Sequence, residues 1–128
     1  MNDKVGYWLK LAEYDMETAR VMLSSGRYLY VGFMCHQVVE KALKGCYEKI
    51  LGATPPKTHN LALLASATAL DRNMPQRQKD ILDELRPMNI QGRYPGDMDA
   101  LGRSLTPQKC RTIIENTEEM LTWIKQQL

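Results

Sequence analysis

The sequence predicts a single all-α domain over residues 1–128, folded as an up-and-down bundle of four or five helices. Apolar residues recur at three- and four-residue spacing over most of the chain, which is the period of an amphipathic helix. No segment shows the regular apolar–polar alternation of a half-buried strand. A chain of 128 residues with 44% apolar content can bury one core without help from a metal or disulfides.

The first half of the chain predicts two antiparallel helices. Residues 3–23 carry an apolar stripe, and Ser24-Ser25-Gly26 forms a short turn after it. Residues 27–51 contain no proline and predict a central helix, which such a short connection places antiparallel to the first. Its core-facing stripe is expected to consist of Tyr28, Val31, Cys35, Val38, Val39, Ala42, Cys46 and Ile50.

A third helix is expected after the run 52–57, whose two prolines break the central helix. Thr58 or Asn60 is of the residue type that caps a helix N-terminus. We expect the third helix to begin there and to reach about Leu70.

The remaining elements are marked by prolines. A fourth helix is expected from about Gln76, and Pro87 should end or kink it. The segment 89–103 holds several glycines and charges without an apolar period, so we interpret it as a long loop. Thr106-Pro107 is a capping residue followed by proline, and it predicts the start of a last helix that runs to the end of the chain.

The composition argues against several classes of site. The net charge of +2 implies no general attraction to nucleic acid or lipid. Cys35, Cys46 and Cys110 are expected to be reduced core residues, because they show no disulfide or metal-ligand spacing. No glycine-rich phosphate loop is present. We therefore expect no metal and no cofactor, and the charged N-terminal segment favours a cytoplasmic protein without a membrane segment.

The far side of the central helix mixes charged and aromatic residues. Glu40 and Lys44 stand four residues apart in the order that favours a surface ion pair on a helix. The alternative is a polar strip in a groove, where His36 and Gln37 join that pair. Lys41 lies on the same polar side, and His59 stands near the start of the third helix. In the segment 89–103 the residues of most interest are Arg93 and Tyr94.

Several residues in order give this chain a resemblance to a known family. They are Trp8, Ala12 and Asp15, then Gly26-Arg27-Tyr28 and Phe33, then the run from His36 to Lys44, then Thr58-His59-Asn60-Leu61, and finally Arg93-Tyr94-Pro95. This set resembles the HEPN domain family, in the branch often paired with minimal nucleotidyltransferases. The resemblance implies a helical bundle that dimerises and a polar groove that accepts nucleotide or RNA. It also implies a nucleotidyltransferase partner in a toxin–antitoxin pair.

The resemblance leaves catalysis open. Many HEPN relatives are metal-independent ribonucleases that use an arginine followed after four to six residues by a histidine. Neither His36 nor His59 has an arginine at that spacing, and no histidine follows Arg93. We therefore assign no catalytic residue, and the groove candidates are His36, Gln37, Glu40, Lys41, Lys44, His59, Arg93 and Tyr94.

Three functions remain open from the sequence. The first is a dimeric binding protein for nucleotide, RNA or a nucleotidyltransferase. The second is a metal-independent endoribonuclease that acts as a toxin. The third is a non-catalytic homodimeric scaffold, in which Phe33 and Leu51 form the interface.

Overall fold

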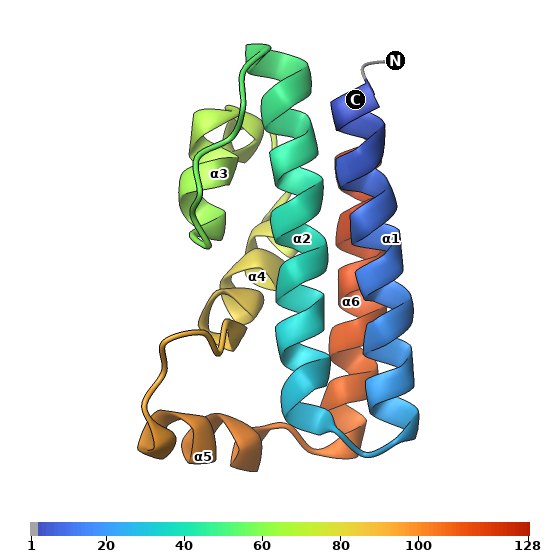
Figure 1. The fold of residues 1–128 in the computed structure, drawn as a ribbon, viewed down its shortest axis with the longest axis vertical. Helices are drawn as coiled ribbons and strands as arrows, with labels where there is room; N and C mark the ends of the chain where they lie inside the picture. The colour runs from blue at the N-terminus through green and yellow to red at the C-terminus, as the bar shows by residue number, and fades with distance from the viewer. Residues whose placement is uncertain (1–2) are drawn as a thin grey trace.

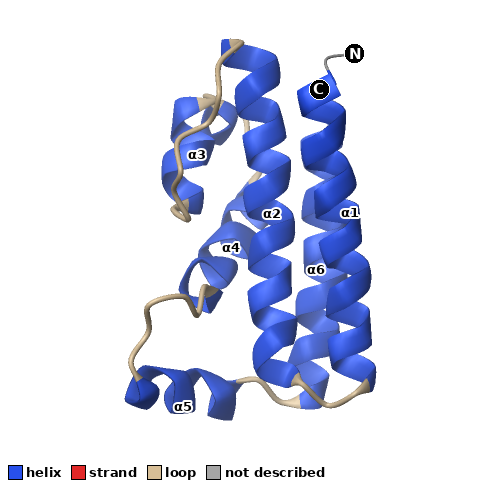
Figure 2. Cartoon of the chain, viewed as in Figure 1, coloured by secondary structure: helices blue, strands red, loops and turns tan. Residues whose placement is uncertain are grey.

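The computed structural model describes residues 3–128, and every regular element in this range is helical (Figure 2). Three long helices lie side by side, and two shorter ones cover one side of the central helix (Figure 1). The helices are α1 (Asp3–Ser24), α2 (Tyr28–Leu51), α3 (Leu61–Ala67), α4 (Gln76–Leu85), α5 (Pro95–Ser104) and α6 (Pro107–Gln126), with 3-10 turns at Leu70–Arg72 and Arg86–Met88. The all-α prediction is confirmed.

Helices α1 and α2 form the expected antiparallel pair. Gly26 has φ +75° in the turn between them, a conformation that residues with a Cβ rarely adopt. A Cβ at Gly45 would lie 3.3 Å from the Cβ of Trp8, so the glycine allows the two helices to approach closely. Lys41 of α2 forms an ion pair with Asp15 of α1 across this contact.

Helix α6 completes the three-helix layer. Its start is as predicted, because Thr106 Oγ1 accepts a hydrogen bond of 3.2 Å from the Lys109 amide and Pro107 occupies the first turn. The three cysteines are buried in the core, as expected. Burial raises the pKa of Cys35 and of Cys46 to about 12, so both thiols are protonated at neutral pH.

Helix α3 begins as expected but ends early. Asn60 Oδ1 accepts a hydrogen bond of 3.0 Å from the Leu63 amide and so caps the helix. The helix stops at Ala67 rather than at Leu70, because Ala69 adopts φ +59° and starts a 3-10 turn. Helix α4 ends at Leu85, just before Pro87, as predicted.

The expectation of a loop over 89–103 is wrong for its second part, which forms α5. Pro95 occupies the first turn, where its fixed φ and missing amide hydrogen are tolerated, and Asp97 follows in the same turn. Helix α5 lies across the end of the bundle (Figure 1) and contains no buried residue. Because it buries no apolar stripe, its sequence lacks the period by which a packed helix is predicted.

The core-facing stripe of α2 is correct except at its ends. Tyr28 is only half-buried and Ile50 is 45% exposed. Lys49 and Leu51 are exposed as well, so the last three residues of α2 lie outside the packed core. In the part of the chain that the structure describes, no helix combines the length and hydropathy needed to cross a membrane.

Candidate functional site

Glu40 is the centre of a group of polar side chains on the face of α2 toward α3. Its Oε1 lies 2.9 Å from Nδ1 of His59, and its Oε2 accepts a hydrogen bond of 3.0 Å from Nζ of Lys44. Nδ1 of His36 lies 3.7 Å from the same Oε1. We call His36, Glu40, Lys44 and His59 the Glu40 cluster. It joins α2 to the segment that precedes α3.

The three α2 members of the Glu40 cluster are buried, so the expectation of a surface ion pair between Glu40 and Lys44 is wrong. Glu40 is 3% exposed and Lys44 is 8% exposed. The ammonium of Lys44 also lies 5.7 Å from the centre of the Trp8 ring, within the range of a cation–π contact. Burying both charges is tolerated because each has a close partner of opposite sign.

His36 is the member of the Glu40 cluster that lies deepest in the protein. It is fully buried, and neither ring nitrogen has a hydrogen-bond partner of ordinary geometry within residues 3–128. Burial lowers the pKa of His36 from 6.5 to about 4, and the negative charge of Glu40 offsets only part of that shift. His36 is therefore neutral at physiological pH.

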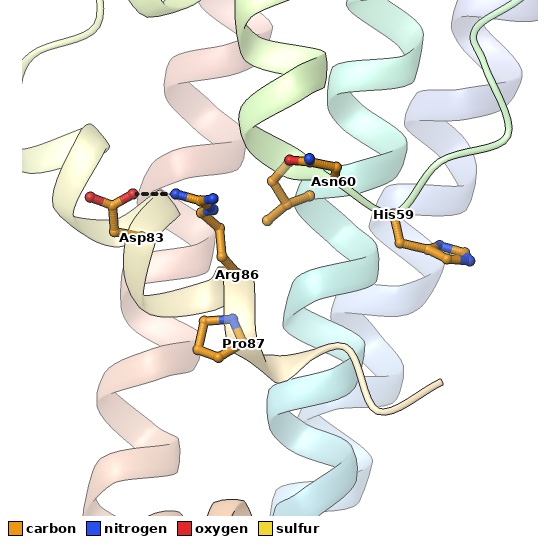
Figure 3. Close-up of a pocket in the computed structure, with 6 residues that line it drawn as sticks. His59, Asn60, Asp83, Arg86 and Pro87 are labelled. Atoms are coloured by element: carbon orange, nitrogen blue, oxygen red, sulfur yellow. Dashed lines mark hydrogen bonds and ion pairs between the residues drawn. The ribbon is translucent and has the colours of Figure 1, made fainter. Parts of the chain in front are cut away.

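His59 connects the buried cluster to an open cavity of about 530 Å³. The side chain of His59 is 47% exposed. The cavity is lined by His59, Asn60, Leu61, Asp83, Arg86 and Pro87. In Figure 3 the guanidinium of Arg86 lies between Asp83 and Asn60, whereas the imidazole of His59 points away from them. That orientation agrees with the bond from His59 to Glu40.

Arg86 is the main positive group of this cavity. Its guanidinium pairs with Asp83 at 3.5 Å, and its side chain is 49% exposed. The pair is long and solvent-exposed, so the guanidinium keeps donors for an incoming acceptor. Sequence reasoning missed Arg86 and Asp83. The one available signal was Pro87, which ends α4 and leaves Arg86 at the helix terminus next to the segment carrying His59.

Arg93 does not line the cavity but lies beside Pro87, which does, and we call this position the rim of the cavity. Its Nε donates a hydrogen bond of 2.8 Å to the carbonyl of Asn89, and its terminal nitrogen donates to the carbonyl of Pro87. These bonds hold the guanidinium beside a residue that lines the cavity. Tyr94 is 78% exposed and contacts neither the Glu40 cluster nor the cavity wall among the interactions of the described residues.

The two remaining candidates on α2, Gln37 and Lys41, lie outside the Glu40 cluster and in different surroundings. Gln37 is 9% exposed, and its Nε2 has no hydrogen-bond partner within the described range. Lys41 points to α1, where it pairs with Asp15. The predicted set therefore divides into the buried cluster, the rim residue Arg93 and three residues outside both: Gln37, Lys41 and Tyr94. Among residues 3–128, no three His, Cys, Asp or Glu side chains are grouped as metal ligands would be.

Comparisons with known proteins identify the family. A family model described as the HEPN domain matches residues 5–127. The chain belongs to the HEPN domain family. The HEPN fold here is similar to the crystal structure of TT1696 from Thermus thermophilus, with a TM-score of 0.81 and 23% identity over 100% of both chains. It is also similar to ST0689, described as an archaeal HEPN homologue, with a TM-score of 0.75 and 26% identity over 97% of each chain. A search of curated proteins finds no match.

The two histidines of this HEPN domain have different surroundings. His59 has the carboxylate of Glu40 as its partner, and His36 is buried among apolar and polar core atoms. The arginines at the cavity beside His59 are Arg86 in its wall and Arg93 at its rim, both later in the sequence. The guanidinium groups and the imidazole near the cavity thus come from different segments of the chain.

Proposed function

We propose that this HEPN domain is a binding protein that acts as a dimer and contacts a phosphate-bearing ligand, either a nucleotide or RNA. We further propose that it belongs to the branch paired with minimal nucleotidyltransferases, in which such an enzyme is its partner in a toxin–antitoxin pair. The observation that supports the binding role is the cavity between α3 and α4. Its wall carries Arg86, and Arg93 is held at its rim.

The chemistry of the cavity favours a phosphate. Guanidinium groups present several donors in a plane and match the oxygens of phosphate. The amide side chain of Asn60 adds polar atoms. Asp83 has the opposite effect, because its carboxylate competes with any anion for Arg86.

The Glu40 cluster positions the cavity and need not touch the ligand. Glu40 holds His59, and His59 precedes the cap residue Asn60. The contact between Glu40 and His59 thereby fixes one wall of the cavity relative to α2. This explains how buried charges on the central helix serve a site on the surface.

Binding is tested by an amide NMR titration of the whole chain with ATP and then with a short RNA. We expect shifts at His59, Asn60 and Arg86. Arg86→Ala should weaken ATP binding about ten- to a hundredfold, because a charge-assisted hydrogen bond contributes roughly 1.5–3 kcal/mol. Asp83→Asn should tighten binding, since it removes the competing carboxylate.

The control is Arg20→Ala on α1, where the arginine pairs with Glu118 far from the cavity wall. It removes the same charge and should leave ATP binding unchanged. If millimolar ATP and RNA both leave the cavity amides unshifted, the ligand proposal is wrong and the partner protein becomes the object of the search.

A second candidate, a metal-independent endoribonuclease, is favoured by the contact between His59 and Glu40. A carboxylate that orients an imidazole is the usual arrangement of a general base. Cleavage by the 2′-hydroxyl would also need a cation at the phosphate, which Arg86 or Arg93 would supply. Purified protein that leaves cellular RNA intact at all concentrations, with no growth arrest on expression, would exclude this role.

A further inference from the structure

The outer face of α1 carries an exposed apolar stripe. Tyr7, Tyr14 and Val21 are 62%, 69% and 58% exposed. They stand seven residues apart, and half-exposed Leu11 and Thr18 fill the intervening positions. The spacing of four and three alternates along the stripe, as in the contact seam of a coiled coil. A large exposed stripe of this kind is typical of an interaction surface.

The charges beside the stripe make it complementary to itself. Lys10 and Glu17 are exposed and flank the stripe on one side, and neither has an ion-pair partner among the described residues. Along the helix axis, Lys10 and Glu17 lie equally far from the midpoint between Glu13 and Tyr14, which we call the Glu13–Tyr14 level. A two-fold axis at that level therefore brings Lys10 of one copy opposite Glu17 of the other, twice in each dimer.

The C-terminal end of α1 offers a further apolar surface. A hollow of about 320 Å³ lies beside the C-terminal end of the stripe and is lined by Met22, Ser25, Arg27, Tyr30 and Met34. In the antiparallel arrangement, Tyr7 of the second copy comes level with Val21, next to this hollow.

We propose that a second copy of this chain docks on this face, with the two α1 helices antiparallel about a two-fold axis at the Glu13–Tyr14 level. This inference rests on the proposed homodimer and names its surface. It places the contact on α1 rather than at Phe33 and Leu51, the residues expected from the sequence. The ligand cavity between α3 and α4 stays open in this dimer, because it is formed by other elements.

A charge exchange tests the register by sedimentation equilibrium of the full chain without ligand. Lys10→Glu places four acidic groups along the contact, and Glu17→Lys places four basic groups there. Each variant alone should weaken the dimer about tenfold. An equimolar mixture should form a heterodimer as tight as the wild type, because every acidic group then faces a basic one. Residues 10 and 17 of one chain cannot form an ion pair with each other, because they are about 10 Å apart along α1.

Two further variants separate the possible outcomes. Tyr14→Arg places like charges at the axis and should give monomers. Leu63→Asp on α3 changes another exposed apolar side chain, 48% exposed, and should stay dimeric. A wild-type dimer that resists Tyr14→Arg, or a mixture no tighter than the single variants, would overturn the α1 interface but not the dimer itself. A wild-type monomer at high concentration would overturn both. The ATP titration is independent of either result.

Discussion

Replacing Glu40 with glutamine is expected to lower the free energy of unfolding by about 3–5 kcal/mol, the usual cost of leaving a buried charge without its partner. The substitution keeps the shape of the side chain and removes its charge. Lys44, only 8% exposed, would then face a neutral amide. His59 would also lose its carboxylate partner.

The prediction is checked by urea unfolding at neutral pH, with a matched exposed pair as the control. Glu119→Gln removes a carboxylate whose side chain is 42% exposed and which pairs with Arg77. That change should cost less than about 1 kcal/mol, because water solvates both partners. A similar small loss for Glu40→Gln would mean that the Glu40 cluster is hydrated.

A double variant tests whether the loss of stability in Glu40→Gln comes from the unpaired charge of Lys44. Removing Lys44 together with the charge of Glu40, as in Lys44→Met with Glu40→Gln, leaves no unpaired charge in the cluster. The double variant should therefore be more stable than Glu40→Gln alone, which is the mark of a coupled pair. If the two losses simply add, the two side chains act independently.

The sequence predicts those elements whose signals are local. Caps, prolines and apolar periods give α1, α2, α4 and α6 to within a residue or two. The same signals fail for α5, which buries no apolar face, and for the end of α3, which is set by the left-handed backbone at Ala69. Neither feature is marked by a buried apolar stripe or by a side-chain cap.

The site was predictable only in part, for a similar reason. His36, Glu40 and Lys44 share one side of a helix, so their proximity follows from helical spacing. Their burial does not, because it depends on Trp8 and on the segment carrying His59. Arg86 could not be chosen from the sequence, since only the fold brings the end of α4 to the same cavity as the start of α3.

Acidification from pH 7.5 to pH 4.5 should destabilise the protein by about 2–3 kcal/mol through His36 alone. Its pKa is about 4 in the folded chain and 6.5 for the unfolded one. Above pH 6.5 both states hold the neutral ring, so the group makes no difference there. As the pH falls toward 4, the unfolded chain binds a proton that the folded chain rejects, and stability is lost over that window.

The variant His36→Met isolates this contribution. Methionine is apolar and flexible enough to fill the space of the imidazole, and the ring forms no hydrogen bond of ordinary geometry that would be lost within residues 3–128. We expect the variant to match the wild type within about 1.5 kcal/mol at pH 7.5 and to be the more stable protein at pH 4.5. Urea unfolding of both proteins at the two pH values gives the comparison. Equal losses on acidification would show that His36 takes up its proton in the folded state, which requires water or Glu40 to reach the ring.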